Sequence, residues 1–305
     1  PPLPSHSTAD LRSLATHPLI ERLLANGPVL TDGAWGTQMQ ARGLAVGGCP
    51  DEWNLTHPET VEEIPRAYVE AGSRIVLTNT FRANRVTLGD YGLADQTEAI
   101  NRAGAEISCR AAAGRAHVFA SLGPSGRMLM MGEVSEQQLL DAFGEQARAL
   151  AAGGAHALVI ETMGDVAEAV LAVQGAKTAG LPVVACLCFD SGAALDRTLM
   201  GTTPEQAAQE LTAAGADVIG ANCGQGIAGY VEICRRLRAA TDRPIWVKPN
   251  AGIPELVNDV PVWKTPPEEF ASYSPALVAA GASFLGGCCG TAPEFIRALG
   301  DALRR

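Results

Sequence analysis

A short unit recurs eight times along this chain, and it constrains the fold more strongly than any other feature of the sequence. Each unit has a turn of small residues, an apolar run rich in β-branched residues, and a polar or glycine-rich exit. Because the runs are continuously apolar rather than alternating, they are typical of parallel strands buried on both faces. The runs occupy residues 27–32, 71–78, 116–122, 155–161, 181–187, 216–221, 243–248 and 282–286.

Helical stretches lie between these runs, with apolar positions at helical spacing over residues 58–70, 135–152, 165–179, 204–214, 229–240 and 275–280. Capping residues open two of them: Ser135 with Gln138 three residues later, and Thr203 before Pro204. Eight strands alternating with helices predict an α/β protein, a single (β/α)8 TIM barrel. A doubly wound sheet is the alternative, and it is disfavoured because no G-x-G-x-x-G motif follows the first run.

Size and composition agree with one barrel. The chain has 305 residues, 47% of them hydrophobic, and such barrels have roughly 250 residues. We expect residues 1–17 to form an N-terminal extension and residues 18–305 the barrel domain. No apolar run reaches the roughly 18–20 residues of a membrane helix, and residues 1–10 lack the pattern of a secretory signal. We therefore expect a cytoplasmic protein. A net charge of −10 without a basic cluster predicts no nucleic-acid and no membrane partner.

Three cysteines follow two of the runs, at the carboxyl ends of strands where the active sites of such barrels lie. Cys223 follows the sixth run, and Cys288 and Cys289 follow the eighth. One strand lies between them, a separation of roughly 10 Å at about 4.8 Å per strand, which ring curvature and side-chain length can close. Three thiolates and one open position are typical of a catalytic zinc site.

The spacing also leaves a second interpretation open, because a cysteine at a strand end is often a small buried apolar residue. Adjacent thiols in a glycine-rich loop pack poorly, so the turn at residues 286–291 favours metal ligation. Eight cysteines are too few for a disulfide scaffold. We assign a packing role to the other five, which are Cys49, Cys109, Cys186, Cys188 and Cys234.

Five motifs at the strand exits resemble the homocysteine S-methyltransferase family. The resemblance covers about residues 18–303, and within the family it is strongest to the homocysteine-binding domain of cobalamin-dependent methionine synthase; betaine–homocysteine methyltransferase is also related. The motifs are Asp32-Gly-Ala-Trp-Gly-Thr37, Asn79-Thr-Phe81, Asn222-Cys-Gly224, Pro249-Asn-Ala-Gly252 and Gly286-Gly-Cys-Cys-Gly-Thr291.

The resemblance implies a (β/α)8 barrel in which Cys223, Cys288 and Cys289 hold Zn²⁺. It also implies a methyltransferase with L-homocysteine as the methyl acceptor and methionine as the product. Zinc deprotonates a coordinated thiol, and the thiolate is the form that attacks a methyl group. By the same resemblance, the side-chain oxygen of Asn250 fills the open position when no substrate is bound. An ordinary turn role for Asn250 stays open.

The amino-acid part of homocysteine needs partners of its own. Asp32 and Glu161 end the first and fourth runs, and the matching family positions bind the ammonium group. The backbone N–H groups of Gly33, Ala34 and Trp35 are candidates to bind the substrate carboxylate, because glycine-containing turns commonly bind anions. Two further contacts at the rim are expected from Asn79 and Thr80.

The methyl donor is less constrained. Trp53 is a candidate for cation–π contact with a quaternary ammonium, as in the betaine enzymes. Those enzymes, however, carry tyrosines where this chain has Arg82 and Thr162, and an arginine repels a cationic donor. The resemblance to the methionine synthase branch implies a methyl group carried on cobalamin. Because the chain lacks the Asp-x-His-x-x-Gly pattern of cobalamin domains, we expect a separate methylated corrinoid protein, with Arg82 and Arg85 as candidate contacts.

Other functions remain open. A small-molecule donor, S-methylmethionine or a betaine, is the alternative. A closed structural or storage zinc site would need a fourth fixed protein ligand. Lys248, at the end of the seventh run, suits a Schiff base or a structural ion pair, and we favour the ion pair. His117 and His156 stand at strand starts and are interpreted as structural. The segment 256–267, with Trp263, is a lid, an interface or plain surface.

Overall fold

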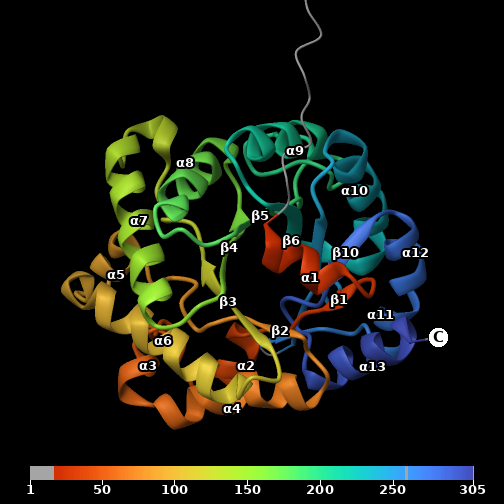
Figure 1. Ribbon diagram of the computed structural model, residues 1–305, viewed down its shortest axis with the longest axis horizontal. Helices are drawn as coiled ribbons and strands as arrows, with labels where there is room; N and C mark the ends of the chain where they lie inside the picture. The colour runs from red at the N-terminus through yellow and green to blue at the C-terminus, as the bar shows by residue number, and fades with distance from the viewer. Residues whose placement is uncertain (1–16, 258–259, 305) are drawn as a thin grey trace, which may run out of the picture.

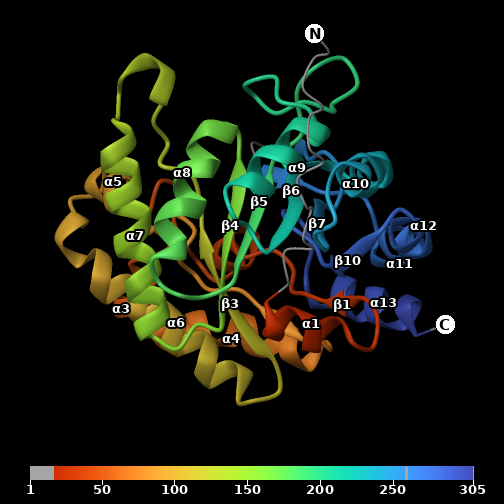
Figure 2. The ribbon, with the colours of Figure 1, turned by 45° about the horizontal axis from the view of Figure 1, so that its top comes forward.

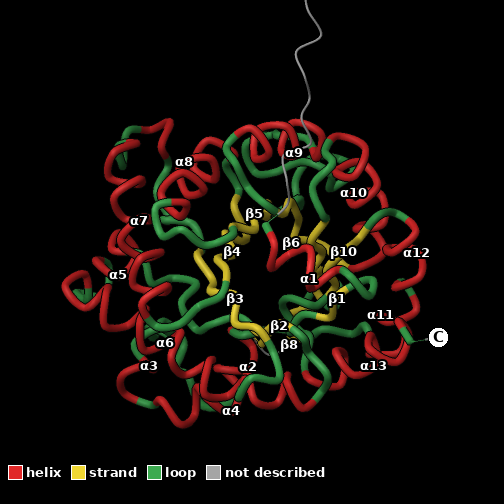
Figure 3. The backbone as a smooth tube through the Cα atoms, in the orientation of Figure 1, coloured by secondary structure: helices red, strands yellow, loops and turns green. Residues whose placement is uncertain are grey.

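Eight parallel strands form a ring at the centre of the computed structural model, which describes residues 17–257 and 260–304 (Figures 1 and 3). The strand order is β1-β10-β7-β6-β5-β4-β3-β2, and every bonded pair is parallel. The backbone N–H of Arg74 donates to the carbonyl of Leu30 at 2.8 Å, joining the two edges of this order. All eight expected runs contain a strand: β1 (Val29–Leu30), β2 (Ile75–Val76), β3 (His117–Leu122), β4 (Ala157–Met163), β5 (Val183–Leu187), β6 (Val218–Gly226), β7 (Ile245–Asn250) and β10 (Ala282–Leu285).

Helices surround the ring, and the six expected helical stretches are confirmed. They are α4 (Pro58–Glu70), α7 (Glu136–Ala152), α8 (Val166–Lys177), α9 (Pro204–Ala213), α10 (Ile227–Ala240) and α12 (Ser274–Ala279). Both expected N-termini form capping boxes, Ser135 with Gln138 and Thr203 with Gln206. The TIM barrel is thereby confirmed. Among the described helices, none combines the length and apolarity required to cross a bilayer.

Shorter elements lie within the loops, and two further long helices, α6 and α13, complete the outer layer (Figure 2). The additional elements are α2 (Gly36–Ala41), α3 (Trp53–Thr56), α5 (Arg85–Gly89), η1 (Ala94–Gln96), α6 (Thr97–Ala112), η2 (Leu129–Met131), the antiparallel hairpin β8 (Glu255–Val257) and β9 (Val260–Val262), α11 (Pro267–Ser272) and α13 (Pro293–Leu303). The segment of undetermined role therefore contains a small hairpin.

Side chains fill the inside of the ring, so the barrel is a packed core and not a pore. Trp246 on β7 lies between Phe119 on β3 and Phe284 on β10, with ring centroids 6.0 and 5.3 Å away. Gly220 on β6 makes room for it, because a Cβ there would lie 2.3 Å from the carbonyl oxygen of Trp246. The core thus supports the strands from within, below the site.

A short first helix, α1 (Pro18–Leu24), covers the amino ends of the strands. Its Leu19, Ile20 and Leu23 are buried in the same cluster as the interior residues of the barrel. In Figure 1 this helix lies across the middle of the ring. The expected N-terminal extension, residues 1–17, lies outside the described residues except for His17, whose Nδ1 accepts the N–H of Leu19 at 3.2 Å. With this end covered, the opposite face carries the open mouth.

Candidate metal and substrate site

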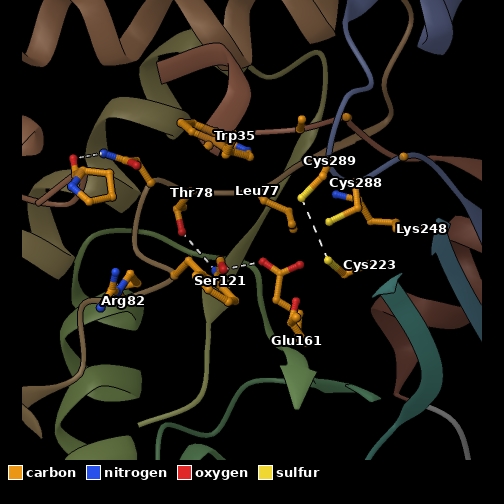
Figure 4. A pocket seen from close by; sticks show the side chains of 18 of the residues that line it. Trp35, Leu77, Thr78, Arg82, Ser121, Glu161, Cys223, Lys248, Cys288 and Cys289 are labelled. Carbon is orange, nitrogen blue, oxygen red and sulfur yellow. Dashed lines mark hydrogen bonds between the residues drawn. The ribbon is translucent and has the colours of Figure 1, made fainter. Parts of the chain in front are cut away.

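A cavity of about 290 Å³ lies at the carboxyl ends of the strands. Figure 4 shows the thiols on one side of it and Arg82 on the other. The cavity brings together most of the expected site residues: Gly33, Ala34, Asn79, Glu161, Cys223, Cys288 and Cys289 line it, together with Trp35, Ser121, Thr162 and Lys248. Asp32, Thr80 and Asn250 do not line it and contact residues that do.

The three expected thiols converge on one point. The Sγ atoms of Cys223, Cys288 and Cys289 all lie within 4.8 Å of one another, and those of Cys223 and Cys289 are 3.9 Å apart. Tetrahedral Zn–S bonds of about 2.3 Å require sulfurs about 3.8 Å apart. The donor set and its spacing therefore fit a zinc ion. Among the described residues, no fourth His, Cys, Asp or Glu joins this cluster.

Backbone irregularities aim these thiols. Cys223 adopts a left-handed conformation with φ of 63°, and the pairing of β6 with β7 shifts register between Cys223 and Gly226. Such bulges redirect a side chain at a strand end. The hydroxyl of Tyr230 donates to the carbonyl of Cys223 at 2.7 Å and secures the turn.

Asn250 joins the two cysteine loops. Its Nδ2 donates to the carbonyl of Gly224 at 3.0 Å, and its Oδ1 accepts the N–H of Cys289 at 3.0 Å. Trp263, which follows the hairpin, packs over Gly290, where a Cβ would lie 2.2 Å from the indole ring. The segment of undetermined role therefore supports the second cysteine loop.

The thiols of the site interact strongly with one another. Hydrogen bonds from Cys188, Cys288 and Cys289 lower the pKa of the Cys223 thiol. The hydrogen bond with Cys223, together with burial, raises the pKa of Cys288. It also raises the pKa of Cys289 to about 12, although the hydrogen bond with Cys288 opposes that rise. All eight cysteines are free thiols. Cys188, interpreted as a packing residue, is buried but lies beside the cluster, and its Sγ is 3.5 Å from Asp190.

Lys248 and Asp32 form a buried ion pair, as expected for this lysine. Burial works against the charged form of Lys248, but Asp32 and Glu161 outweigh it and raise its pKa. The second carboxylate oxygen of Asp32 accepts the indole N–H of Trp35 at 3.0 Å and the backbone N–H of Leu77 at 2.7 Å. A lysine held protonated in this way is a poor Schiff-base nucleophile.

Glu161 is the carboxylate that lines the cavity. One oxygen accepts the hydroxyl of Ser121, and the other lies 3.4 Å from Nδ2 of Asn222. Burial raises the pKa of Glu161, and attraction by Lys248 opposes the rise. A cationic group entering the cavity would meet this carboxylate.

The turn after β1 is close-packed. At Gly33 a Cβ would lie 2.8 Å from the Tyr68 ring, so only glycine fits there. The N–H of Ala34 already donates to Thr291, to Oγ1 at 3.1 Å and to the carbonyl at 3.3 Å. Within the described residues the N–H groups of Gly33 and Trp35 bond to no acceptor, so they are the donors left for an anion.

The expected rim residues are mostly engaged with the protein. The Nδ2 of Asn79 donates to the carbonyl of Pro50 at 2.7 Å, and the hydroxyl of Thr80 donates to the backbone carbonyl of Ser121 at 2.7 Å. Arg82 lines the cavity with its guanidinium 5.5 Å from the Tyr91 ring centroid. Arg85 instead pairs with Glu145 at 2.6 Å, outside the cavity.

Three residues discussed as alternatives or as structural residues are also located. Trp53 stacks on His57 at 4.5 Å and does not line the cavity. His117 and His156 meet edge to face at 5.1 Å, and the Nδ1 of His156 accepts the N–H of Val118, as expected for structural histidines. Two polar cavity residues, Ser121 and Asp51, were not foreseen from the sequence. The role of Asn222, which was named only as part of a motif and lies outside the cavity lining, was not foreseen either. Of these, Asn222 stands beside Cys223, a position that offered a signal.

A closed α/β barrel with a thiol cluster and a carboxylate in its mouth defines a class of barrel enzymes, and comparisons with known proteins give the family. The family model for homocysteine S-methyltransferase matches residues 29–303. The methionine synthases of Mycobacterium leprae and Mycobacterium tuberculosis are each 33% identical, over 301 and 300 residues. The chain belongs to the homocysteine S-methyltransferase family.

The matched relatives are much longer. The alignments cover 92% of this chain, which spans about a quarter (25%) of the length of either methionine synthase. Among solved structures, the metallated homocysteine methyltransferase MmuM from Escherichia coli superposes with a TM-score of 0.77 at 24% identity, covering 94% of this chain and 99% of that one. The carboxyl transferase domain of Rhizobium etli pyruvate carboxylase has a TM-score of 0.55 at 14% identity, covering 93% of this chain and 48% of that one. Both likenesses establish the fold alone.

Proposed function

We propose that this chain is a zinc-dependent homocysteine S-methyltransferase that makes methionine. The observation that carries the proposal is the cluster of Cys223, Cys288 and Cys289, whose sulfurs lie within 4.8 Å of one another beside the cavity. Zinc, when bound there, would supply a Lewis acid that keeps the substrate sulfur as a thiolate. The absence of a fourth cluster ligand among the described residues supports an open site over a closed structural one.

The protein's own residues orient the amino acid. The Glu161 carboxylate accepts the ammonium group, and Asp32 adds a second negative charge that Lys248 shares. The N–H groups of Gly33 and Trp35 bind the carboxylate, and Asn79 borders the cavity. Held at both ends, the substrate presents its sulfur to the cysteine side of the cavity, so the reacting atom is oriented before the donor arrives.

Asn250 has two roles in this proposal. It ties the cysteine loops together through Gly224 and Cys289, and its Oδ1 would be the side-chain oxygen available as a further zinc ligand beside the three cysteines. The N–H of Cys289 would keep that oxygen hydrogen-bonded whether or not it contacts the metal. Thr80 supports the rim through Ser121.

We further propose that the donor is methylated cobalamin presented by a separate corrinoid protein, in the cytoplasm. The similarity to methionine synthases supports a donor of that branch. Arg82 in the cavity wall disfavours a cationic donor. The free state of all eight cysteines agrees with a reducing compartment.

A methyl-transfer assay tests the proposal. The purified chain, loaded with zinc, is given L-homocysteine and one donor at a time: a methylated corrinoid protein, S-methylmethionine or glycine betaine. We expect methionine only with the corrinoid protein. Rapid turnover with a small donor would overturn the donor proposal, and no turnover with any donor would count against the reaction itself. In the same assay, Cys223→Ser tests the cluster by removing one of its three thiols. The matched control is Cys109→Ser, which removes a thiol remote from the cluster.

A further inference from the structure

Asn222 is a buried amide that touches both halves of the site. It lies on β6, directly before Cys223, and is fully buried. Its side chain crosses to the end of β4, where its Oδ1 accepts the backbone N–H of Thr162 at 2.7 Å. Its Nδ2 donates to the Thr162 hydroxyl, also at 2.7 Å. Two hydrogen bonds thus fix one residue at its backbone and its side chain.

Thr162 needs such support because its backbone is strained. Its φ is 60°, a left-handed value that β-branched residues rarely adopt. The pairing of β4 with β5 shifts register at this point, between Ile160 and Met163. Strained residues persist where their surroundings hold them, and they cluster at functional sites. The strain here lies directly after Glu161.

The side-chain nitrogen of Asn222 has two hydrogens to donate but three acceptors around it. A side-chain amide has two hydrogens to donate, and the Thr162 hydroxyl takes one at 2.7 Å. The same nitrogen lies 3.4 Å from Oε2 of Glu161 and 3.9 Å from Sγ of Cys288. The second hydrogen therefore lies between the carboxylate proposed to bind the ammonium group and a thiol proposed to bind the metal.

We propose that Asn222 is a positioning residue whose shared amide hydrogen couples recognition of the substrate ammonium to the charge on the Cys288 sulfur. The proposal rests on the proposed function. When an ammonium group neutralises Glu161, that carboxylate attracts the shared hydrogen less strongly, and the contact of this hydrogen with the Cys288 sulfur becomes the stronger of the two. An N–H···S bond withdraws charge from the sulfur, and such contacts tune the ligand behind them. When the bound thiol has no ammonium group, the contact of the shared amide hydrogen with Glu161 remains the stronger one.

Cobalt(II) substitution provides a readout that does not need turnover. The sulfur-to-cobalt charge-transfer band reports the charge on the cysteine sulfurs. We expect L-2-aminobutyrate, which has the ammonium group but no sulfur, to shift this band in the native protein. In Asn222→Asp the band should not respond, because that variant retains the acceptor for the Thr162 N–H and loses both donated hydrogens. A response equal to the native one would overturn the proposal.

Binding gives a second measure. We expect the native protein to prefer L-homocysteine over 4-mercaptobutanoate, its analogue without the ammonium group, and Asn222→Asp to reduce this preference about tenfold. Asn101→Asp is the matched control, since Asn101 is another buried amide, on α6 and away from the thiols. An unchanged preference in Asn222→Asp would contradict the coupling.

A purely structural role is tested separately. Glycine adopts a φ of 60° without strain, so Thr162→Gly should restore the coupling in Asn222→Asp if Asn222 only supports that turn; this rescue would overturn the proposal. If Asn222→Asp does not fold, Glu161→Gln tests the same hydrogen, and its cobalt band should not respond to L-2-aminobutyrate; a native response would overturn the coupling. Failure of the proposed function looks different: L-homocysteine itself would then leave the cobalt spectrum of the native protein unchanged.

Discussion

Lys248 is the residue on which the buried charges of the site depend. It is 2% exposed and pairs with Asp32, which is 0% exposed. Removing one partner of a buried ion pair leaves an unpaired charge, which costs about 3–5 kcal/mol. We expect Lys248→Met to lower the free energy of unfolding by about that amount, as measured by urea denaturation.

An exposed pair provides the comparison. Lys264 and Glu255 pair on the surface with side chains 65% and 60% exposed, and such pairs contribute about 0–1 kcal/mol. Lys264→Met should therefore have little effect. Equal losses for Lys248→Met and Lys264→Met would refute the buried-pair interpretation.

Asp51 should make stability depend on pH. Burial raises the pKa of this carboxyl group to about 7, and its Oδ2 has no hydrogen-bond partner. A raised pKa means that Asp51 keeps its proton to higher pH in the folded state. Its contribution to the free energy of unfolding is therefore full below about pH 4 and is lost as the pH rises to about 7. The loss is on the order of 4 kcal/mol.

The neutral variant Asp51→Asn should remove this dependence. The stability of the variant relative to the native protein should rise between pH 4 and pH 7 and stay level above that, as followed by urea denaturation at each pH. The N–H of Arg82, which donates to Oδ1 of Asp51, can still find an oxygen acceptor there. A constant difference across this range would show that Asp51 ionises normally.

Individual residues were predictable where their type carries the chemistry. Cysteines after the sixth and eighth runs indicated a shared site because strand ends meet at one face. Asn222 and Ser121 were not foreseen, since a buried amide or hydroxyl acts through hydrogen bonds that only the folded chain defines. The ion pair of Lys248 was favoured, but its partner Asp32 was expected to face the substrate instead.

At the scale of elements, periodicity was sufficient for the strands and for six helices. It did not find α6, whose buried face mixes Ile100 and Ile107 with the small or polar residues Asn101, Gly104 and Ser108. Gly104 is required by close packing, because a Cβ there would lie 2.6 Å from Thr80. Small and polar residues at buried positions interrupt the apolar pattern of such a helix.

Helix α1 should stabilise the barrel from its closed end. Ile20 is fully buried in the interior cluster, and large-to-small changes at such positions cost about 2–5 kcal/mol. We expect Ile20→Ala to lower the melting temperature substantially while leaving the affinity for homocysteine unchanged, because α1 lies opposite the mouth.

The exposed Glu21 on the same helix provides the control. Glu21→Ala should change stability by less than about 0.5 kcal/mol. An Ile20→Ala variant as stable as Glu21→Ala would mean that α1 does not pack against the barrel in solution.

At the scale of the whole molecule, the metal should add stability without making the fold. The ring, its interior and its helices bury an extensive apolar core, unlike a small zinc domain. We expect chelation to preserve the far-UV circular dichroism spectrum and to lower the melting temperature. Linkage predicts a loss of about 4 kcal/mol when free zinc had been 1,000-fold above its Kd. Unfolding on chelation would instead make zinc a structural element.

The methyl donor could not be settled at this scale from the sequence. A donor carried by another protein leaves few marks on the acceptor barrel, since contact there involves surface loops rather than a motif. The acceptor side is better defined, because a thiol-binding metal site requires particular residue types at particular strand ends.

The most direct measurement is zinc X-ray absorption on the purified protein, with and without L-homocysteine. We expect three sulfurs and one lighter ligand without the substrate, and four sulfurs with it. That change would establish an open position that binds the acceptor thiol beside Cys223, Cys288 and Cys289. A shell that homocysteine leaves unchanged, or a cluster that binds no zinc, would contradict the proposed function.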